Sequence, residues 1–474
     1  MQNSKSLSGS TIWYSFGNFV VRSMSFILLP LYSHMISTND FGIYSLLMSF
    51  YAIAAVLFQS GMQNALMKYY LEADDIDQKK KIFSSIVNSI CSLGVLFTVT
   101  GILFSKEISQ FVLGAPQYSK LTALLFISLF IDTLGYFGLH LLKTQIKAKK
   151  VVSYSLASAI TNLILNIVFV YSLKMGVEGI FLAQIISSLF LIIFLIKDIF
   201  TDYKFTIDFD FIKKATIFSL PIIIGGVLSS AVDVCDRFFL NFFTDKNTVG
   251  IYSLSYRIAI VMNVFVISFR TAWIPHALNL YKTSDSALIF GKTYLKLLSI
   301  VFLILITVTL FAPFLFNIKL FNVFLLDKNY EPGLIILPYI LLGYLINGII
   351  AFYSLYPFIS NKSYHFLISD GLAFLVNIAL NLILIPALGM LGAAIATTAA
   401  FFIGALYLYF VSVNNITIIY PVKEILQLIF ITAIVFVLGM LEKSFYADIL
   451  LLLIYLVVIS RVAKIKVTSL IKIS

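Results

Sequence analysis

Fourteen long apolar stretches divide this chain, and they constrain its fold more than any other feature. Hydrophobic residues are 60% of the 474 residues and charged residues only 12%. An average soluble domain is about 45–50% apolar and about 25% charged. Each stretch is near the length of about 20 residues that a helix needs to cross a bilayer, and too long for the alternating strands of a membrane barrel. We therefore expect an all-α integral membrane protein with about fourteen transmembrane helices. The expected spans are 11–34, 41–67, 82–104, 120–142, 151–172, 176–197, 215–240, 249–275, 293–316, 333–357, 364–386, 389–412, 424–441 and 447–463.

A repeat with a period of roughly 210 residues runs through most of the chain. The five residues Gly-Ile-Tyr-Ser-Leu occur at 42–46 and again at 250–254. Other matched positions are Asn162 with Asn377, Asn166 with Asn381, Gly176 with Gly389, Gly179 with Gly392, and Tyr69 with Tyr281. In a membrane protein such self-similarity is typical of a transporter built from two related halves.

The repeat predicts two pseudo-symmetric lobes of six spans each, followed by two extra helices. The N-terminal lobe is expected at 1–200, the C-terminal lobe at 201–414 and the additional pair at 415–474. Because each half has an even number of spans, both halves enter the membrane in the same direction. Their symmetry axis should then lie along the membrane normal.

The Lys and Arg residues of the connecting loops predict the orientation. One side of the membrane carries 22 of these basic residues and the other side carries 7. Since basic loops stay in the cytoplasm, we expect both termini there. The net charge of +11 mostly reflects this bias. It does not indicate nucleic-acid binding, because the basic residues are spread over many short loops. We see no cleavable signal peptide, and the first span is expected to be retained.

Several functional classes find no support in the sequence. No P-loop and no loop long enough for a soluble domain is present, so ATP-driven transport is not indicated. Cys91 and Cys235 both fall inside apolar stretches and do not suggest a disulfide framework or a metal site. No catalytic constellation is visible. We therefore expect no enzyme activity, no metal and no bound cofactor.

Arginines inside the spans are the main indication of function. A charge near the bilayer centre costs from about 2.5 kcal/mol upward, so it normally faces a cavity or a partner. Arg22 and Arg257 lie deep in their spans, and Arg270 lies closer to the cytoplasm. One interpretation is a cationic cavity between the halves for an anionic substrate, because the guanidinium fork binds phosphate in two places. The other is a set of structural ion pairs between helices.

Carboxylates inside the spans admit the same two interpretations. Asp132, Asp233, Asp236 and Asp370 are candidates to carry a coupling proton or sodium ion. Asp233 and Arg237 are four residues apart and can pair on one helix face.

Uncharged polar residues also occur within the spans. The pairs Asn162/Asn166 and Asn377/Asn381 each lie along one helix face, and hydrogen bonding between helices is their expected role. Contact with a sugar is the alternative role for such residues, and Asn64 is the uncharged candidate for substrate binding.

These motifs together resemble a known family. The residues that carry the resemblance are Asn377 and Asn381, Pro386, Gly389, Gly392-Ala393-Ala394, Ala396-Thr397, the segment 61–69, Asp236-Arg237 and the segment 250–254. They are similar to the signature of polysaccharide-biosynthesis membrane proteins, the Wzx-type O-antigen flippases. This family lies in the MOP superfamily with MATE-type multidrug exporters and lipid II flippases.

The resemblance implies a specific transport function. Such proteins move undecaprenyl-pyrophosphate-linked oligosaccharide units across the bacterial inner membrane, for lipopolysaccharide O-antigen or capsule. They are thought to use alternating access through a cationic cavity, with proton or sodium coupling proposed for some members. Arg22, Arg257 and Arg270 are the positions that fit this cavity. Expected partners are the lipid-linked oligosaccharide, membrane lipids and other polysaccharide-assembly proteins.

Two other transporters remain alternatives. A MATE-like cation-coupled drug exporter would use carboxylates rather than arginines and usually has twelve spans. A lipid II flippase is closer in class. A membrane-embedded polymerase or glycosyltransferase usually has a large loop or a soluble domain, and neither is visible.

Overall fold

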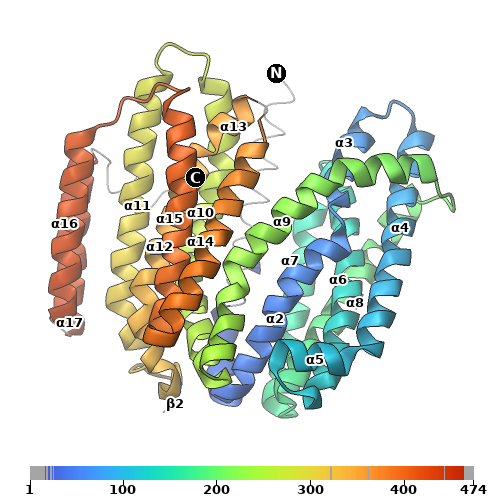
Figure 1. Ribbon diagram of the computed structural model, residues 1–474, viewed down its shortest axis with the longest axis horizontal. Helices are drawn as coiled ribbons and strands as arrows, with labels where there is room; N and C mark the ends of the chain where they lie inside the picture. The colour runs from blue at the N-terminus through green and yellow to red at the C-terminus, as the bar shows by residue number, and fades with distance from the viewer. Residues whose placement is uncertain are drawn as a thin grey trace. The chain divides into compact units, whose positions relative to one another are not determined.

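The computed structural model describes residues 17, 20, 21, 24, 26–320, 323–360, 362–441 and 444–463. Within these residues the chain is almost entirely helical (Figure 1). Thirteen helical segments are long and apolar enough to cross a membrane, and a shorter apolar helix covers Phe26–Met35. The expected all-α membrane fold with about fourteen spans is therefore confirmed.

The helices have the following bounds. The first half of the chain contains α2 (Thr38–Gln59), α3 (Met62–Glu72), α4 (Ile76–Leu103), α5 (Ser105–Leu113), η1 (Pro116–Tyr118), α6 (Ser119–Thr144), α7 (Ala148–Asn166), the π-helix η2 (Ile167–Ser172) and α8 (Gly176–Asp202). The remainder contains α9 (Phe209–Phe243), α10 (Lys246–Leu280), α11 (Ser286–Leu315), η3 (Lys328–Ile336), α12 (Leu337–Tyr353), α13 (Leu355–Ile359), α14 (Tyr364–Leu388), α15 (Met390–Val413), α16 (Val422–Leu441) and α17 (Phe445–Val462). A short antiparallel pair, β1 (Lys319–Leu320) and β2 (Val323–Phe324), follows α11.

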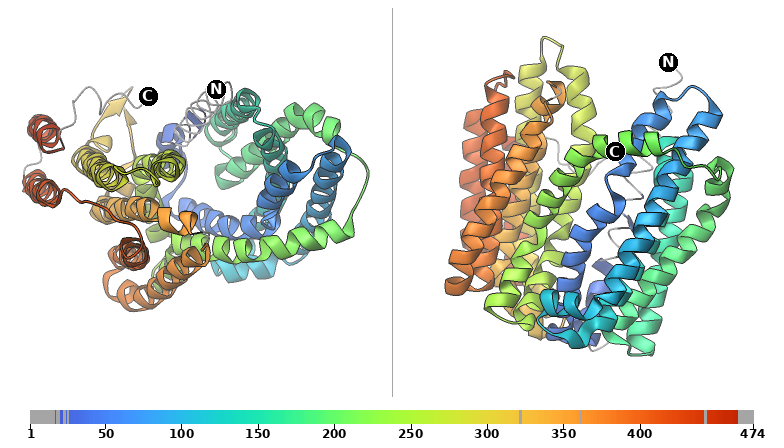
Figure 2. Two further views of the ribbon diagram at one scale, coloured as in Figure 1. Left: turned by 90° about the horizontal axis from the view of Figure 1, so that it is seen from above. Right: turned by 45° about the vertical axis from the view of Figure 1, so that its right-hand side comes forward.

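The chain forms two compact units, Met1–Gly250 and Ile251–Ser474. Unit 1 includes α9, which packs against α2, α3 and α4 (Figures 1 and 2). The repeat instead places α9 at the start of the second lobe. The predicted lobes 1–200 and 201–414 stay a prediction, because compactness and sequence repetition are different properties.

The span formed by α2 and α3 is broken in its second half. Ser60 and Gly61 both have left-handed backbone conformations, with φ of 48° and 60°. This break lies against α9, where the Ser219 hydroxyl donates a hydrogen bond to the Gly61 carbonyl at 3.2 Å. Two residues later α9 contains Pro221, which removes a backbone donor from the helix interior. Figure 1 shows α9 curving along its length.

The start of α9 is fixed by a side-chain cap. Asp208 accepts a hydrogen bond from the Phe211 N–H at 2.9 Å, and it forms an ion pair with Lys81 at 2.9 Å. The Phe211 N–H and the Lys81 ammonium hold the pKa of Asp208 below its usual range. This cap anchors α9 to α4, the helix that carries Lys81.

Unit 2 is organised around paired helices. α14 and α15 form an extensive hairpin, and α12 packs on α15. The indole N–H of Trp273 on α10 donates to the Phe352 carbonyl on α12 at 3.1 Å. The last two helices, α16 and α17, pack against α11 and against each other (Figures 1 and 2).

The repeated Gly-Ile-Tyr-Ser-Leu motif has a structural explanation in unit 1. A Cβ atom at Gly42 would collide with the Lys246 carbonyl oxygen, and one at Gly250 would collide with the Thr38 carbonyl oxygen. α2 and the first turn of α10 therefore touch backbone to backbone. Beside them the Thr38 hydroxyl donates to Asn247 Oδ1 at 2.8 Å.

We predict that Gly42→Ala and Gly250→Ala each destabilise the protein. The new methyl group forces the two backbones apart, and such overpacking costs about 1–3 kcal/mol. Thermal unfolding of the detergent-purified protein measures the effect. Gly225→Ala is the matched control, because a Cβ there meets no atom within 4 Å. Unfolding of the Gly42→Ala variant at the same temperature as this control would contradict the assignment.

Candidate functional site

Asp132 of α6 is the centre of a polar cluster inside unit 1. The Tyr51 hydroxyl on α2 donates to its Oδ2 at 2.5 Å, and the Ser128 hydroxyl donates to the same oxygen at 3.3 Å. From α8, the Gln184 amide lies 3.1 Å from both carboxylate oxygens. The Ser188 hydroxyl donates to Oδ1. One carboxylate thus collects donors from three helices.

The hydrogen bonds to Asp132 stabilise its ionised form, whereas its burial opposes that form. An ionised carboxylate accepts at both oxygens, and a protonated one would donate a hydrogen bond to a neighbouring hydroxyl. Since the donors belong to α2, α6 and α8, the charge on one side chain links three helices. A proton or small cation bound at Asp132 would therefore change hydrogen bonds that all three helices share.

A cavity of about 280 Å³ with a mixed polar and apolar lining adjoins this cluster. Its polar lining comes from Ser155, Ser158 and Asn162 of α7 and from Gln184 and Ser187 of α8. Gln184 lines the cavity and also donates to Asp132, so it connects the two. A solvated ion or a polar group in this cavity would act on the carboxylate through a single side chain.

The sequence predicted Asp132 but not its partners. Hydropathy does not identify Tyr51, Gln184 or Ser188, although Gln184 and Ser188 are four residues apart within an apolar stretch. That i,i+4 spacing, shared by Ser128 and Asp132, is the available signal for a polar helix face.

The first Asn pair builds a second polar network in unit 1. Asn166 Nδ2 donates to Asn162 Oδ1 at 3.0 Å, and Asn162 Nδ2 donates to the Ser187 hydroxyl at 3.1 Å. The Tyr32 hydroxyl in turn donates to Asn166 Oδ1 at 2.8 Å. The Asn pair therefore joins α7 to α8 and to the segment that contains Tyr32.

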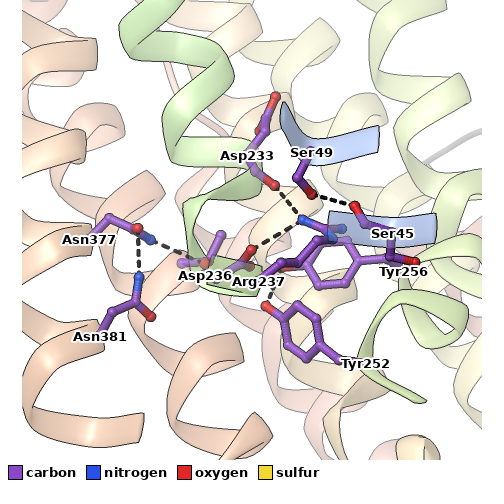
Figure 3. Close-up of polar contacts among 10 residues, drawn as sticks. Ser45, Ser49, Asp233, Asp236, Arg237, Tyr252, Tyr256, Asn377 and Asn381 are labelled. Carbon is purple, nitrogen blue, oxygen red and sulfur yellow. Dashed lines mark hydrogen bonds and ion pairs between the residues drawn. The ribbon is translucent and has the colours of Figure 1, made fainter. Parts of the chain in front are cut away.

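The second Asn pair repeats this pattern in unit 2. Asn381 Nδ2 donates to Asn377 Oδ1 at 2.8 Å, as Figure 3 shows, and Asn377 Nδ2 donates to the Thr397 hydroxyl at 3.1 Å. Both Asn side chains are fully buried. Hydrogen bonding between helices, the role expected for both pairs, thus occurs in each unit. Asn381 Oδ1 is buried and has no hydrogen-bond partner within the described part of the chain.

On α9, Arg237 and Asp236 form an ion pair. Arg237 Nη1 lies 3.1 Å from Asp236 Oδ1 and 2.9 Å from the main-chain carbonyl oxygen of Asp233 (Figure 3). The Asp236 side chain is fully buried, whereas Asp233 is exposed. Asp236 therefore has an ion-pair partner on its own helix, whereas the structural interpretation of these charges expects ion pairs between helices.

The arginine candidates have different surroundings. Arg257 is half-buried in α10. Arg270 is exposed near the other end of the same helix, where its Nη2 donates to Asn347 Oδ1 of α12 at 3.2 Å. It also interacts electrostatically with Asp370 of α14, which is half-buried. The structure thus brings Arg270, Asn347 and Asp370 into one polar region of unit 2.

Two further candidates complete the set. Arg22 lies outside the residues that the structure describes. Asn64 is exposed in the first turn of α3, and its N–H donates to the Gly61 carbonyl at 3.2 Å. Their predicted contact with substrate, like that of Arg257 and Arg270, stays a prediction.

The sequence matches a known protein family. Residues 7–279 match the family model described as polysaccharide biosynthesis protein. An uncharacterized membrane protein of Methanocaldococcus jannaschii is 24% identical over 425 residues, covering 82% of this chain and 81% of that protein.

The fold is similar to two kinds of solved transporter. The lipid II flippase MurJ in an inward closed conformation superposes with a TM-score of 0.75 at 20% identity, covering 95% of this chain and 98% of that one. An inward-facing multidrug resistance MATE family transporter of the MOP superfamily gives 0.65 at 16% identity, covering 83% and 98%. At these identities the likeness establishes the fold. Because the family model spans more than half of the sequence, the chain belongs to the polysaccharide biosynthesis protein family.

Proposed function

We propose that this protein is a flippase that moves lipid-linked oligosaccharide units across the membrane for polysaccharide assembly. The observation that carries the proposal is the family match over residues 7–279. The fold similarity to a solved lipid II flippase supports it. The finer proposal is an undecaprenyl-pyrophosphate-linked unit of O-antigen or capsule, carried across a bacterial inner membrane with both termini of the protein in the cytoplasm.

A flippase is physically necessary for such a substrate. Sugar hydroxyls and a diphosphate lose their hydrogen bonds to water in hydrocarbon, at a cost of several kcal/mol for each unsatisfied group. Fixed positive side chains replace part of that hydration. Arg257 and Arg270 of α10 are proposed to supply this charge, since a guanidinium stays ionised at any relevant pH and binds phosphate in two places.

Asp132 is the proposed coupling site for a proton or sodium ion. Its carboxylate is held by donors from α2, α6 and α8, and one of them, Gln184, lines the 280 Å³ cavity. Cation binding there would loosen the hydrogen bonds among the three helices. Ion-coupled alternating access needs such a step, in which an ion changes the relative stability of two conformations.

A MATE-like cation-coupled exporter is the second candidate. The similarity to a multidrug resistance MATE transporter and the polar cluster around the Asp132 carboxylate favour it.

The two candidates differ in what accumulates when the protein is absent. A strain lacking the gene should trap complete lipid-linked sugar units on the cytoplasmic face if the protein is the flippase. Normal surface polymer with no trapped unit would contradict the flippase and leave the exporter.

We predict that Arg257→Ala lowers export of lipid-linked units roughly 10-fold or more, because a hydrogen bond to a charged group is worth about 1.5–3 kcal/mol. Surface polymer in a complemented deletion strain measures export, and immunoblotting of membranes measures protein amount. Arg461→Ala is the matched control, since Arg461 is exposed on α17. Equal polymer from the two variants would count against a substrate role for Arg257.

We predict that Asp132→Asn abolishes the dependence of transport on a proton or sodium gradient. Asparagine keeps the shape of the side chain but cannot hold the negative charge. Transport into vesicles is measured with each gradient imposed separately. Asp285→Asn is the control, because Asp285 is exposed outside the spans. The coupling role would be wrong if the Asp132→Asn protein responded to both gradients like this control.

A further inference from the structure

Two lysines from different helices converge on one tyrosine ring in unit 1. Lys68 Nζ of α3 lies 5.1 Å from the centre of the Tyr69 ring, and Lys214 Nζ of α9 lies 4.9 Å from it. Lys68 Nζ is also 4.5 Å from the centre of the Phe218 ring. The two ammonium groups are therefore no more than about 10 Å apart.

The packing of α3 on α9 fixes this arrangement. Phe211, Lys214 and Phe218 are spaced i, i+3 and i+7, so they share one face of α9. The Tyr69 ring packs edge-on against Phe211 and Phe218, with ring centres 5.5 and 5.9 Å apart. Tyr69 is buried by these contacts, whereas the two lysines stay exposed. The aromatic cluster thus lies beneath two exposed, positively charged side chains.

Two nearby lysines differ from this pair in having acidic partners. Lys81 pairs with Asp208 at 2.9 Å, and Lys204 pairs with Asp77 at 2.7 Å. Neither Lys68 nor Lys214 makes an ion pair with an acidic side chain of the described residues. The aromatic rings attract both ammonium groups, but the two like charges repel each other. An anion bound beside these ammonium groups would offset that repulsion.

We propose that Lys68 and Lys214, whose ammonium groups both lie over the Tyr69 ring, form a binding site for a phosphate oxyanion. α3 is the last segment of its span and leads directly into the charged segment 74–81, which places the site at the membrane surface that the loop charges predict to be cytoplasmic. Two chemically similar sources of phosphate reach this surface. One is the headgroup of an anionic membrane lipid, and the other is the diphosphate of a polyprenyl carrier; only the second rests on the proposed function.

The test compares the double variant Lys68→Gln/Lys214→Gln with the intact protein in detergent. Native mass spectrometry measures retention of dioleoyl phosphatidylglycerol, of undecaprenyl diphosphate and of zwitterionic dioleoyl phosphatidylcholine as the reference. Each basic residue at an anionic surface contributes enough to predict binding about tenfold weaker or more when two are lost. Lys213→Gln/Lys149→Gln is the matched control, since it removes the same charge from exposed positions. Lys68→Arg/Lys214→Arg should retain binding.

Each outcome decides the proposal. Weaker binding of both anionic ligands supports a general phosphate site, and weaker binding of one alone supports the site and identifies its source. Equal retention by the double variant and the intact protein would overturn it, as would an equal loss in the charge-matched control. Phosphatidylglycerol binding does not depend on transport, so failure of the flippase function would leave this result unchanged.

Discussion

Polar groups inside a membrane span must find their partners within the protein, and this requirement governs the arrangement of the described helices. Asp132 joins α2, α6 and α8 through its donors, and Asn166 joins α7 to Tyr32. Hydrocarbon offers no competing partner, so each such bond restricts which helices can be neighbours. Apolar side chains fill the remaining space between helices whose possible neighbours the polar contacts restrict.

The sequence predicted the elements better than their contacts. The spans follow from hydropathy, because each must match the bilayer thickness. Hydropathy does not predict the break at Ser60–Gly61, since a short polar interruption does not end an apolar stretch. It does not predict α5 either, because α5 lies in the connection between the spans expected at 82–104 and 120–142. The partners of Asp132 come from distant parts of the sequence, and periodicity within one helix does not identify its neighbours.

The two copies of the Asn pair share one polar contact and differ in another. Each Asn pair bonds to a hydroxyl on the next helix in its own unit. The first pair also receives a hydrogen bond from the Tyr32 hydroxyl. In the second pair, Asn381 Oδ1 has no hydrogen-bond partner among the described residues. The two halves have thus kept a shared framework while their buried polar groups acquired different surroundings.

The contact between Gly61 and Ser219 has a mechanical consequence. The α2–α3 span loses its regular helical geometry at Ser60–Gly61, and α9 lacks a backbone donor at Pro221. The hydrogen bond between Ser219 and Gly61 ties these two weak points together. Each helix has fewer regular backbone hydrogen bonds at this depth, so the two interruptions coincide in space although they are far apart in the sequence. Bending of either helix at this depth would therefore be transmitted to the other through the contact between Ser219 and Gly61.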